Sequence, residues 1–257
     1  MITDGSLVDS IEYKREKVVS EPEYHLVRRK KMEDFLDELS VSCYEDGDDE
    51  DFSTRASYTS EFDHMDEELR ENMGDAWDYA RENIDDIPDH NDLITVNHLL
   101  RYGTEPDFDM LSGDITRYYR DKNVRITGCD DFHVYCPPEP ERIYQELEGM
   151  KERLEGLEEE PDRSSYAHLL TVMIQPFQDA NKRTAAIVQN AMLYNSDSPM
   201  SVIPHHEKLE YKNKLMRAMD AERKGERKGK EHLFDYFAEK MDREMDLVLE
   251  ECGYSTL

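Results

Sequence analysis

The strongest constraint on the fold is the spacing of apolar residues in the middle of the chain. Ile143, Leu147, Met150, Leu154 and Leu157 follow each other at intervals of four, three, four and three residues. This spacing places the side chains on one face of a helix, and that face must be buried against other elements. Helical spacing recurs at 24–39, 69–80, 93–100, 166–174, 184–194, 208–221 and 233–249. We therefore expect an all-α bundle of roughly eight helices.

Two parts of the chain depart from this helical pattern. Residues 1–20 show no consistent period. The β-rich runs Val124–Thr127 and Phe132–Tyr135 are separated by the glycine-containing segment Gly128–Asp131. Two such runs around a short polar loop predict one β-hairpin within the helical protein.

The charge balance bears on the partners of the chain. Asp and Glu number 61 against 32 Lys and Arg, which leaves a formal net charge of −29. Such a surface repels phosphate backbones and anionic lipids, so we expect no nucleic-acid and no membrane partner. The even dispersion of the acids favours a halophilic protein built for molar salt, while a nucleic-acid mimic and an ordinary acidic protein stay as alternatives.

The cysteines and the first residues bear on the compartment. The four cysteines show no paired C-x-x-C spacing, and the start MITDGSLVDS has neither a basic stretch nor an apolar core. No apolar stretch reaches the length of a membrane span. These features predict a cytoplasmic protein with reduced thiols.

The segment Gln175–Arg183, between two apolar helices, is the most informative for function. Short polar residues that lead into the first turn of a helix leave several backbone N–H groups unpaired at the positive end of the helix dipole. Such a point binds an anion, typically a phosphate. The alternative is a plain turn between helices with solvent-facing charges.

Individual side chains of this segment suit phosphate chemistry. Asn181 can fix the loop by side-chain hydrogen bonds, while Lys182 and Arg183 add cationic donors for phosphate oxygens. Asp179 is a carboxylate placed to hold Mg²⁺ that bridges those oxygens. Phe177 is expected to be the apolar anchor of the loop.

The same stretch, Q-P-F-Q-D-A-N-K-R-T-A at 175–185, resembles the signature of the Fic/Doc (Fido) family. The family pattern is H-P-F-x-D-G-N-G-R, and the Doc-type form H-x-F-x-D-A-N-K-R-T-A is closer. The resemblance extends to Ala167, His168 and Ile174 before the motif and to Asn190 after it. Tyr119–Gly128 with Pro137 and Pro138 resembles the target-docking flap of the family, and Leu209–Phe237 resembles its closing helices.

The resemblance covers about residues 54–240 and implies a Fido-type helical bundle with one β-hairpin flap. It divides the chain into an N-terminal helix with an acidic linker (1–53), a Fic/Doc-like domain (54–240) and a C-terminal helix end with a tail (241–257). The acidic run Glu45–Asp51 supports the linker, since it is too self-repelling to fold locally. The basic run Arg223–Lys230 is expected to be a solvated loop.

Family members bind a nucleotide with Mg²⁺ and transfer AMP or, in the Doc type, the γ-phosphate to a protein hydroxyl. The resemblance implies ATP or another nucleoside triphosphate as cofactor, a target protein such as a translation factor, and an antitoxin as partner of a toxin. The implied catalytic residues are Gln175, Asp179 and Arg183, and Asp179 is also the implied metal ligand. The implied nucleotide-binding residues are Phe177, Ala180, Asn181, Lys182, Arg183 and Asn190. The implied flap residues that align the target are Val124, Ile126, Thr127, Phe132 and Val134.

Two positions depart from the family pattern. Gln175 stands where the family has its general base, a histidine, and a neutral amide cannot take a proton from a hydroxyl. His168, His205 and His206 are candidate substitutes, although His168 is expected to be a structural histidine packed between helices. Ala186 replaces a second arginine of many AMP-transferring members, which shifts the expectation toward phosphoryl transfer.

An upstream segment resembles the inhibitory motif of many Fic proteins. Ser57 and Glu61 have the serine-to-glutamate spacing of that motif, but Phe62 replaces its final glycine or asparagine. These two residues are therefore candidate inhibitory residues.

Three functions remain open at this stage. The first is a protein-modifying transferase, either an AMPylator or a Doc-like kinase. The second is an inactive relative that binds nucleotides or proteins without transfer. The third is an acidic nucleic-acid mimic, which leaves the loop and the flap unexplained.

Overall fold

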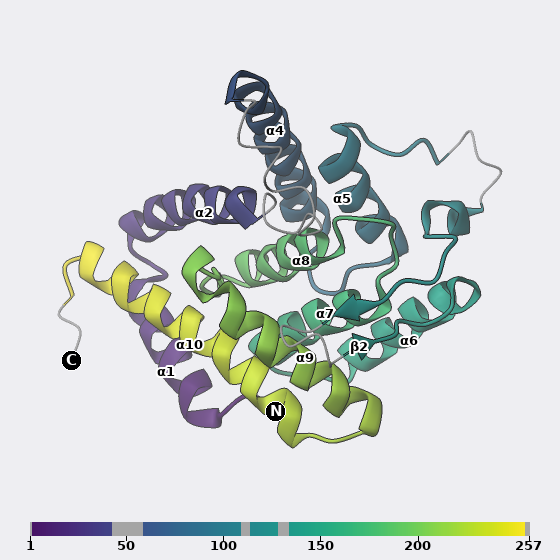
Figure 1. Cartoon of the computed structure of the whole chain (residues 1–257). Coiled ribbons are helices and arrows are strands. Elements are labelled where there is room, and N and C mark those ends of the chain that lie inside the picture. Colours follow the sequence, from purple (N-terminus) through teal and green to yellow (C-terminus); the bar gives the residue numbers. More distant parts are fainter. Residues whose placement is uncertain (1, 43–58, 109–113, 128–133, 255–257) are drawn as a thin grey trace.

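The computed structural model describes residues 2–42, 59–108, 114–127 and 134–254. The described chain is mainly helical, with nine α-helices and one two-stranded sheet (Figure 1). The prediction of an all-α bundle with one β-hairpin is thereby confirmed. The helices are α1 (Gly5–Val18), α2 (Pro22–Ser42), α4 (Thr59–Asn83), α5 (His90–Tyr102), α6 (Ile143–Glu155), α7 (Glu160–Ile174), α8 (Asn181–Asn195), α9 (Lys208–Lys224) and α10 (Lys228–Glu251).

The short elements are three 3₁₀ turns and two strands. The turns are η2 (Ile115–Tyr118), η3 (Pro140–Arg142) and η4 (His205–Glu207). Strand β1 (Ile126–Thr127) pairs antiparallel with β2 (Val134–Tyr135), with Ile126 opposite Tyr135. The predicted hairpin therefore forms, while its loop and Phe132 lie outside the described residues.

Helices α7 and α8 form the centre of the bundle and pack directly against each other (Figure 1). Nearly every residue of α7 after its first is buried, including polar ones such as Asp162 and His168, because neighbouring helices cover this helix on several sides. Helices α4 and α5 pack on α8 from one side, while α6, α9 and α10 contact α7. The loop between the two central helices is thus held by packing on several sides.

The N-terminal residues differ from the prediction of an aperiodic start. Residues Gly5–Val18 form α1, whose Val8, Ile11 and Val18 are buried. The helix packs against α10, more than two hundred residues later in the sequence. Only three buried apolar residues in fourteen give a weak periodic signal, so tertiary packing rather than local pattern makes this segment helical.

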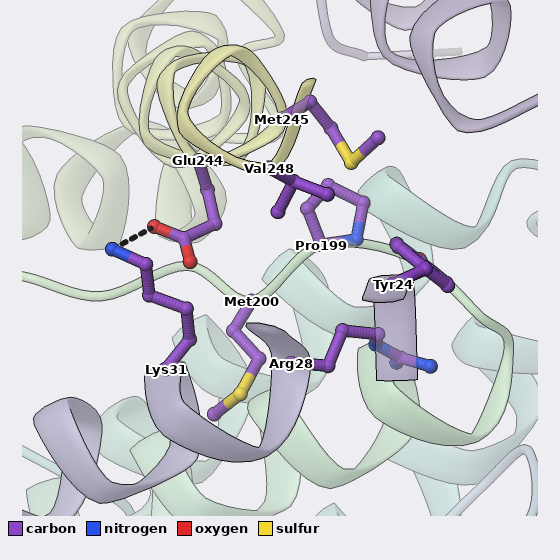
Figure 2. A pocket seen from close by; sticks show the side chains of 8 residues that line it. All are labelled: Tyr24, Arg28, Lys31, Pro199, Met200, Glu244, Met245 and Val248. Atoms are coloured by element: carbon purple, nitrogen blue, oxygen red, sulfur yellow. Dashed lines mark ion pairs between the residues drawn. The ribbon is translucent and has the colours of Figure 1, made fainter. Parts of the chain in front are cut away.

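Helix α2 is fastened to the bundle by two cationic side chains. Arg28 is almost fully buried and donates from Nη1 to Asp197 (2.9 Å) and from Nη2 to the Tyr194 carbonyl (2.6 Å). Lys31 reaches the Glu244 carboxylate of α10 at 3.7 Å, beside Met200 (Figure 2). These contacts join α2 to the end of α8 and the residues after it, and to the C-terminal helix α10.

The predicted boundaries inside the C-terminal part do not coincide with element ends. The boundary at 240/241 falls inside α10. The basic run Arg223–Lys230, predicted to be a loop, belongs mostly to helices: α9 ends with Gly225 as its left-handed C-cap (φ 68°), and α10 begins at Lys228. The predicted acidic linker Glu45–Asp51 lies outside the described residues.

No helix among the described residues combines the length and the apolar character needed to cross a membrane.

Candidate functional site

The site begins where α7 ends in a strained residue. Gln175 has a left-handed backbone (φ 48°), which is uncommon for a residue with a side chain. Its Nε2 donates to the Val172 carbonyl at 3.0 Å, and its Oε1 accepts from Asn181 Nδ2 at 3.0 Å. Both ends of the amide are therefore engaged within the loop.

Asn181 ties the loop together from the first turn of α8. Its Oδ1 accepts from the Phe177 backbone N–H, and its Nδ2 donates to the Phe177 carbonyl, both at 2.9 Å. The Phe177 ring is 1% exposed and lies against Tyr119, with ring centroids 6.3 Å apart. The ring anchors the loop to the core, while the amide of Asn181 fixes its curvature.

Two residues that sequence reasoning missed hold the loop from outside. Asn97 of α5 donates from Nδ2 to the Asp179 carbonyl (2.9 Å) and to Thr184 Oγ1 (3.1 Å). A polar residue in the apolar run 93–100 was the available signal, but its partners lie more than eighty residues away.

Arg120 is the second missed residue, since the sequence placed it only in the flap. It is 2% exposed, donates from its backbone N–H to the Pro176 carbonyl (2.8 Å) and from Nε to the Gln175 carbonyl (2.7 Å). Its Nη1 reaches the Lys122 carbonyl (2.7 Å), and Nη2 reaches that of Pro138. One guanidinium therefore joins the loop to both ends of the hairpin segment.

The N-terminus of α8 carries the features of an anion site. Its N-cap, Ala180, has a left-handed backbone (φ 62°) and no side chain that can bond the first-turn N–H groups. The first backbone bond of the helix is from Thr184 N–H to the Ala180 carbonyl at 2.8 Å. The positive end of the helix dipole, with the first-turn N–H groups that have no acceptor within the helix, thus lies at the bend.

Asp179 stands beside this helix end. Its Oδ1 accepts from the Ala180 N–H at 2.6 Å, and its Oδ2 lies 3.7 Å from Arg183 Nη2. The Asp179 side chain is 71% exposed, so its carboxylate is accessible to a ligand. Among the described residues no group of three or more His, Cys, Asp or Glu could hold a metal. A single carboxylate beside a phosphate site suits Mg²⁺, which takes few protein ligands and completes its shell with phosphate oxygens and water.

A cavity of about 460 Å³ opens in front of the bend. It is lined by the loop, by Arg125–Thr127 of the hairpin segment, by α2, α8 and α9, and by the segment 201–204. Five cationic residues border it (Arg125, Lys182, Arg183, Lys208 and Lys212), against two acidic ones, Glu38 and Asp179. In a chain with almost two acids for each base, this local excess of positive charge would attract an anion.

His168 lies under the cavity and does not offer the missing base. It is buried between α7 and α9, with Nε2 2.7 Å from Tyr211 Oη. Burial lowers the pKa of His168 to about 4, so the ring is neutral near pH 7 and accepts protons poorly. His206 is exposed, outside the residues that line the cavity, and the side chain of His205 is not described.

The structure brings most of the predicted loop residues to one place. Those that line the cavity are Gln175, Asp179, Ala180, Asn181, Lys182 and Arg183, together with Ile126 and Thr127 of the hairpin. Phe177 lies behind the loop, and neither Val124 nor Val134 is among the lining residues.

Asn190 was predicted to bind the nucleotide but lies outside the cavity lining. It is buried, donates from Nδ2 to the Ala186 carbonyl (3.0 Å) and accepts from the Ser201 N–H (2.7 Å). Its amide therefore holds the segment after α8 to the helix, and a role for Asn190 in nucleotide binding stays a prediction. Ser57 lies outside the described residues; Glu61 belongs to α4, but its side chain is not described.

Comparisons with known proteins agree with the motif. The Fic/DOC family model matches residues 87–193. No curated protein matches this chain.

Solved structures of Fic proteins share the fold over nearly the whole chain. A Fic domain containing signaling protein from Bacteroides thetaiotaomicron has a TM-score of 0.67 at 15% identity, covering 97% of this chain and 98% of that one. A Fic family protein from Desulfovibrio desulfuricans has a TM-score of 0.69 at 16% identity, covering 98% and 75%. Fic-1 from C. elegans, residues 134–508, has a TM-score of 0.62 at 15% identity, covering 96% and 71%. The family model thus matches the part of the chain that contains the bend, the hairpin, α7 and nearly all of α8, and the solved Fic structures share its fold.

Proposed function

We propose that this protein binds a nucleoside triphosphate, such as ATP, with Mg²⁺ and transfers part of it to a hydroxyl side chain of a target protein. The observation that carries the proposal is the cationic cavity at the α8 N-terminus, in a protein that is otherwise strongly acidic. A triphosphate is the anion that best matches a helix N-terminus with adjacent cationic side chains.

Each loop residue has a role in this proposal. The first-turn N–H groups and Arg183 hold phosphate oxygens, and Asp179 holds the metal. When bound, Mg²⁺ neutralises charge on the phosphates. Asn181, Asn97 and Arg120 keep the bend in shape before any ligand arrives, which lowers the entropy cost of binding.

The hairpin suits the alignment of a target segment. Thr127 and Val134 are paired and exposed, and Arg125 to Thr127 border the cavity. An extended target segment could add to this edge by backbone hydrogen bonds, which would bring its hydroxyl toward the phosphates. A translation factor as target and an antitoxin as partner remain part of the proposal on family grounds.

Transfer of the γ-phosphate is favoured over transfer of AMP. The transition state of phosphoryl transfer is loose, so positioning and charge stabilisation contribute more than proton abstraction. Gln175 can orient a hydroxyl but cannot deprotonate it, and Lys182 places a cation in the anion loop.

The engaged amide of Gln175 also favours a second candidate function, an inactive relative. With both amide ends bonded inside the loop, Gln175 serves the structure of the bend. A protein of this kind would bind the nucleotide and act as a sensor or interaction module without transfer.

One experiment separates these functions. The purified protein is incubated in molar KCl with Mg²⁺, cell extract and ATP labelled at the α- or the γ-phosphate, and nucleotide binding is measured in parallel by calorimetry. Arg183→Ala should weaken binding by about 10- to 100-fold, since hydrogen bonds to charged groups are strong. Arg142→Ala, a change of an exposed arginine paired with Glu146, is the matched control.

The label identifies the reaction. Transfer from the γ position supports phosphorylation, and transfer from the α position supports AMPylation. Binding without transfer supports the inactive relative. If the protein binds no triphosphate in the presence of Mg²⁺, the proposed function is wrong.

A further inference from the structure

Two buried polar atoms without hydrogen-bond partners border the cavity. Among the described residues, His168 Nδ1 and Gln189 Nε2 are buried without a partner, and both residues line the cavity. Gln189 is 1% exposed. A buried donor without an acceptor is costly and needs an explanation, and a ligand that supplies the acceptor is one.

The position of Gln189 suits the far end of a nucleotide. It lies eight residues after Asn181 on α8, which corresponds to about 12 Å along the helix axis. The cavity lining also includes the apolar or aromatic side chains of Tyr211, Leu215 and Met216, and Tyr211 contacts His168. A nucleotide whose phosphates lie at the bend would direct its base toward this part of the cavity.

The neighbours of Gln189 fix which end of its amide is available. The ring of His168 is held at Nε2 by Tyr211. The Gln189 side chain and the Ala185 backbone raise the pKa of His168, against the larger effect of burial, as hydrogen-bond acceptors beside the ring do, while Nδ1 itself has no hydrogen-bond partner. With Oε1 turned to His168, the amide offers its Nε2 hydrogens to a ligand.

We propose that Gln189 is the residue that reads the base of the bound nucleotide, by donating from Nε2 to a carbonyl oxygen on that base. The proposal rests on the proposed nucleotide binding and adds a specificity to it. Guanine carries two adjacent acceptors, O6 and N7, and uracil carries O4, whereas adenine places the amino group N6 beside its N7 acceptor. A donor at this position therefore favours a keto base over adenine.

The test compares the affinities of GTP, ITP, UTP and ATP, with Mg²⁺ in molar KCl, for the wild type and Gln189→Leu. The wild type should bind GTP and ITP about 3- to 10-fold more tightly than ATP, the range of one neutral hydrogen bond. Gln189→Leu should remove this preference. Gln178→Leu, the same change at a glutamine on the loop side of the cavity, should keep it.

Inorganic tripolyphosphate has no base, so it tests binding of the phosphates separately from recognition of the base. If the wild type and Gln189→Leu bind tripolyphosphate equally and have the same melting temperature, the lost preference for GTP and ITP is due to the contact between Gln189 and the base. Gln189→Met is the second variant if Gln189→Leu lowers the melting temperature. A wild type that binds tripolyphosphate but shows no preference for keto bases overturns this inference and leaves the proposed function standing. A wild type that binds neither tripolyphosphate nor any nucleotide overturns both.

Discussion

Asn181 Nδ2 donates to Gln175 Oε1 at 3.0 Å, which joins the residue that departs from the family motif to the residue that shapes its loop. Gln175 is thus integrated into the bend through its side chain as well as its left-handed backbone. The substitution at this position keeps the shape of an anion site while removing the basic nitrogen.

Gln175→His should raise the rate of transfer to a protein hydroxyl. A positioned base commonly contributes about 10²- to 10⁴-fold, and imidazole titrates near neutrality. The measurement is the rate of label incorporation at saturating nucleotide. Gln178→His, a change at an exposed glutamine three positions along the loop, should leave the rate unchanged. An unchanged rate in Gln175→His with intact nucleotide binding would show that the missing base does not limit the reaction.

Asn181→Ala should loosen the bend. The substitution removes three hydrogen bonds at a residue that is 5% exposed, so we expect a loss of about 2–3 kcal/mol in the free energy of unfolding. Nucleotide affinity should fall as well, because the first turn of α8 loses its fixed entry. Chemical denaturation and calorimetry measure the two effects. The control is Asn83→Ala, which removes a bond from an exposed asparagine to the Tyr79 carbonyl. It should change the free energy of unfolding and the nucleotide affinity much less.

Arg120→Lys should destabilise the protein despite its retained charge. A single ammonium group cannot reach the carbonyls that the buried guanidinium bonds in the loop and the hairpin segment. We expect a loss of about 2–4 kcal/mol, since buried carbonyls are left without donors. Thermal unfolding measures the loss, and the exposed Arg142→Lys should stay close to the wild type. Equal stability of the two variants would mean that the Arg120 bonds contribute little.

Glu244 should make stability depend on pH. Burial raises the pKa of Glu244 from 4.5 to about 6, although Lys31 acts in the opposite direction. The folded state therefore binds this proton more tightly than the unfolded state, and the resulting stabilisation is complete below pH 4.5 and is lost as the pH rises through 6.

Glu244→Gln should accordingly be more stable than the wild type at pH 7.5, by about 1–2 kcal/mol, with a smaller difference at pH 4.5. Melting temperatures across this range at constant salt test the effect, with the exposed Glu239→Gln of the same helix as control. A variant that is less stable than the wild type at pH 7.5 would show that the ion pair with Lys31 outweighs the desolvation of Glu244.

Local patterns predicted the parts of the fold whose signal is local. The apolar spacing of 143–157 and the β-rich runs around 128–131 appear as α6 and the hairpin, and the helical spacing at 93–100 lies within α5. The motif at 175–185 placed the bend. These features depend on residues that are neighbours in the sequence, so their physical causes are visible there.

The missed features depend on partners far along the chain. Helix α1 packs against α10, Asn97 bonds the loop more than eighty residues later, and Arg120 bonds the carbonyls of Pro138 and Gln175. The bond from the Ser201 N–H to Asn190 likewise depends on how the segment after α8 folds back onto the helix. Such contacts are set by tertiary packing, which no local periodicity encodes.

Helix α2 contributes Phe35, Glu38 and Leu39 to the boundary of the cavity. The C-terminal part of α2 is thus a wall of the cavity, although the sequence placed it outside the Fic/Doc-like domain. A shortened protein that starts after α2 would lack these three side chains, and the cavity would be open to bulk water on that side even with the bend preserved.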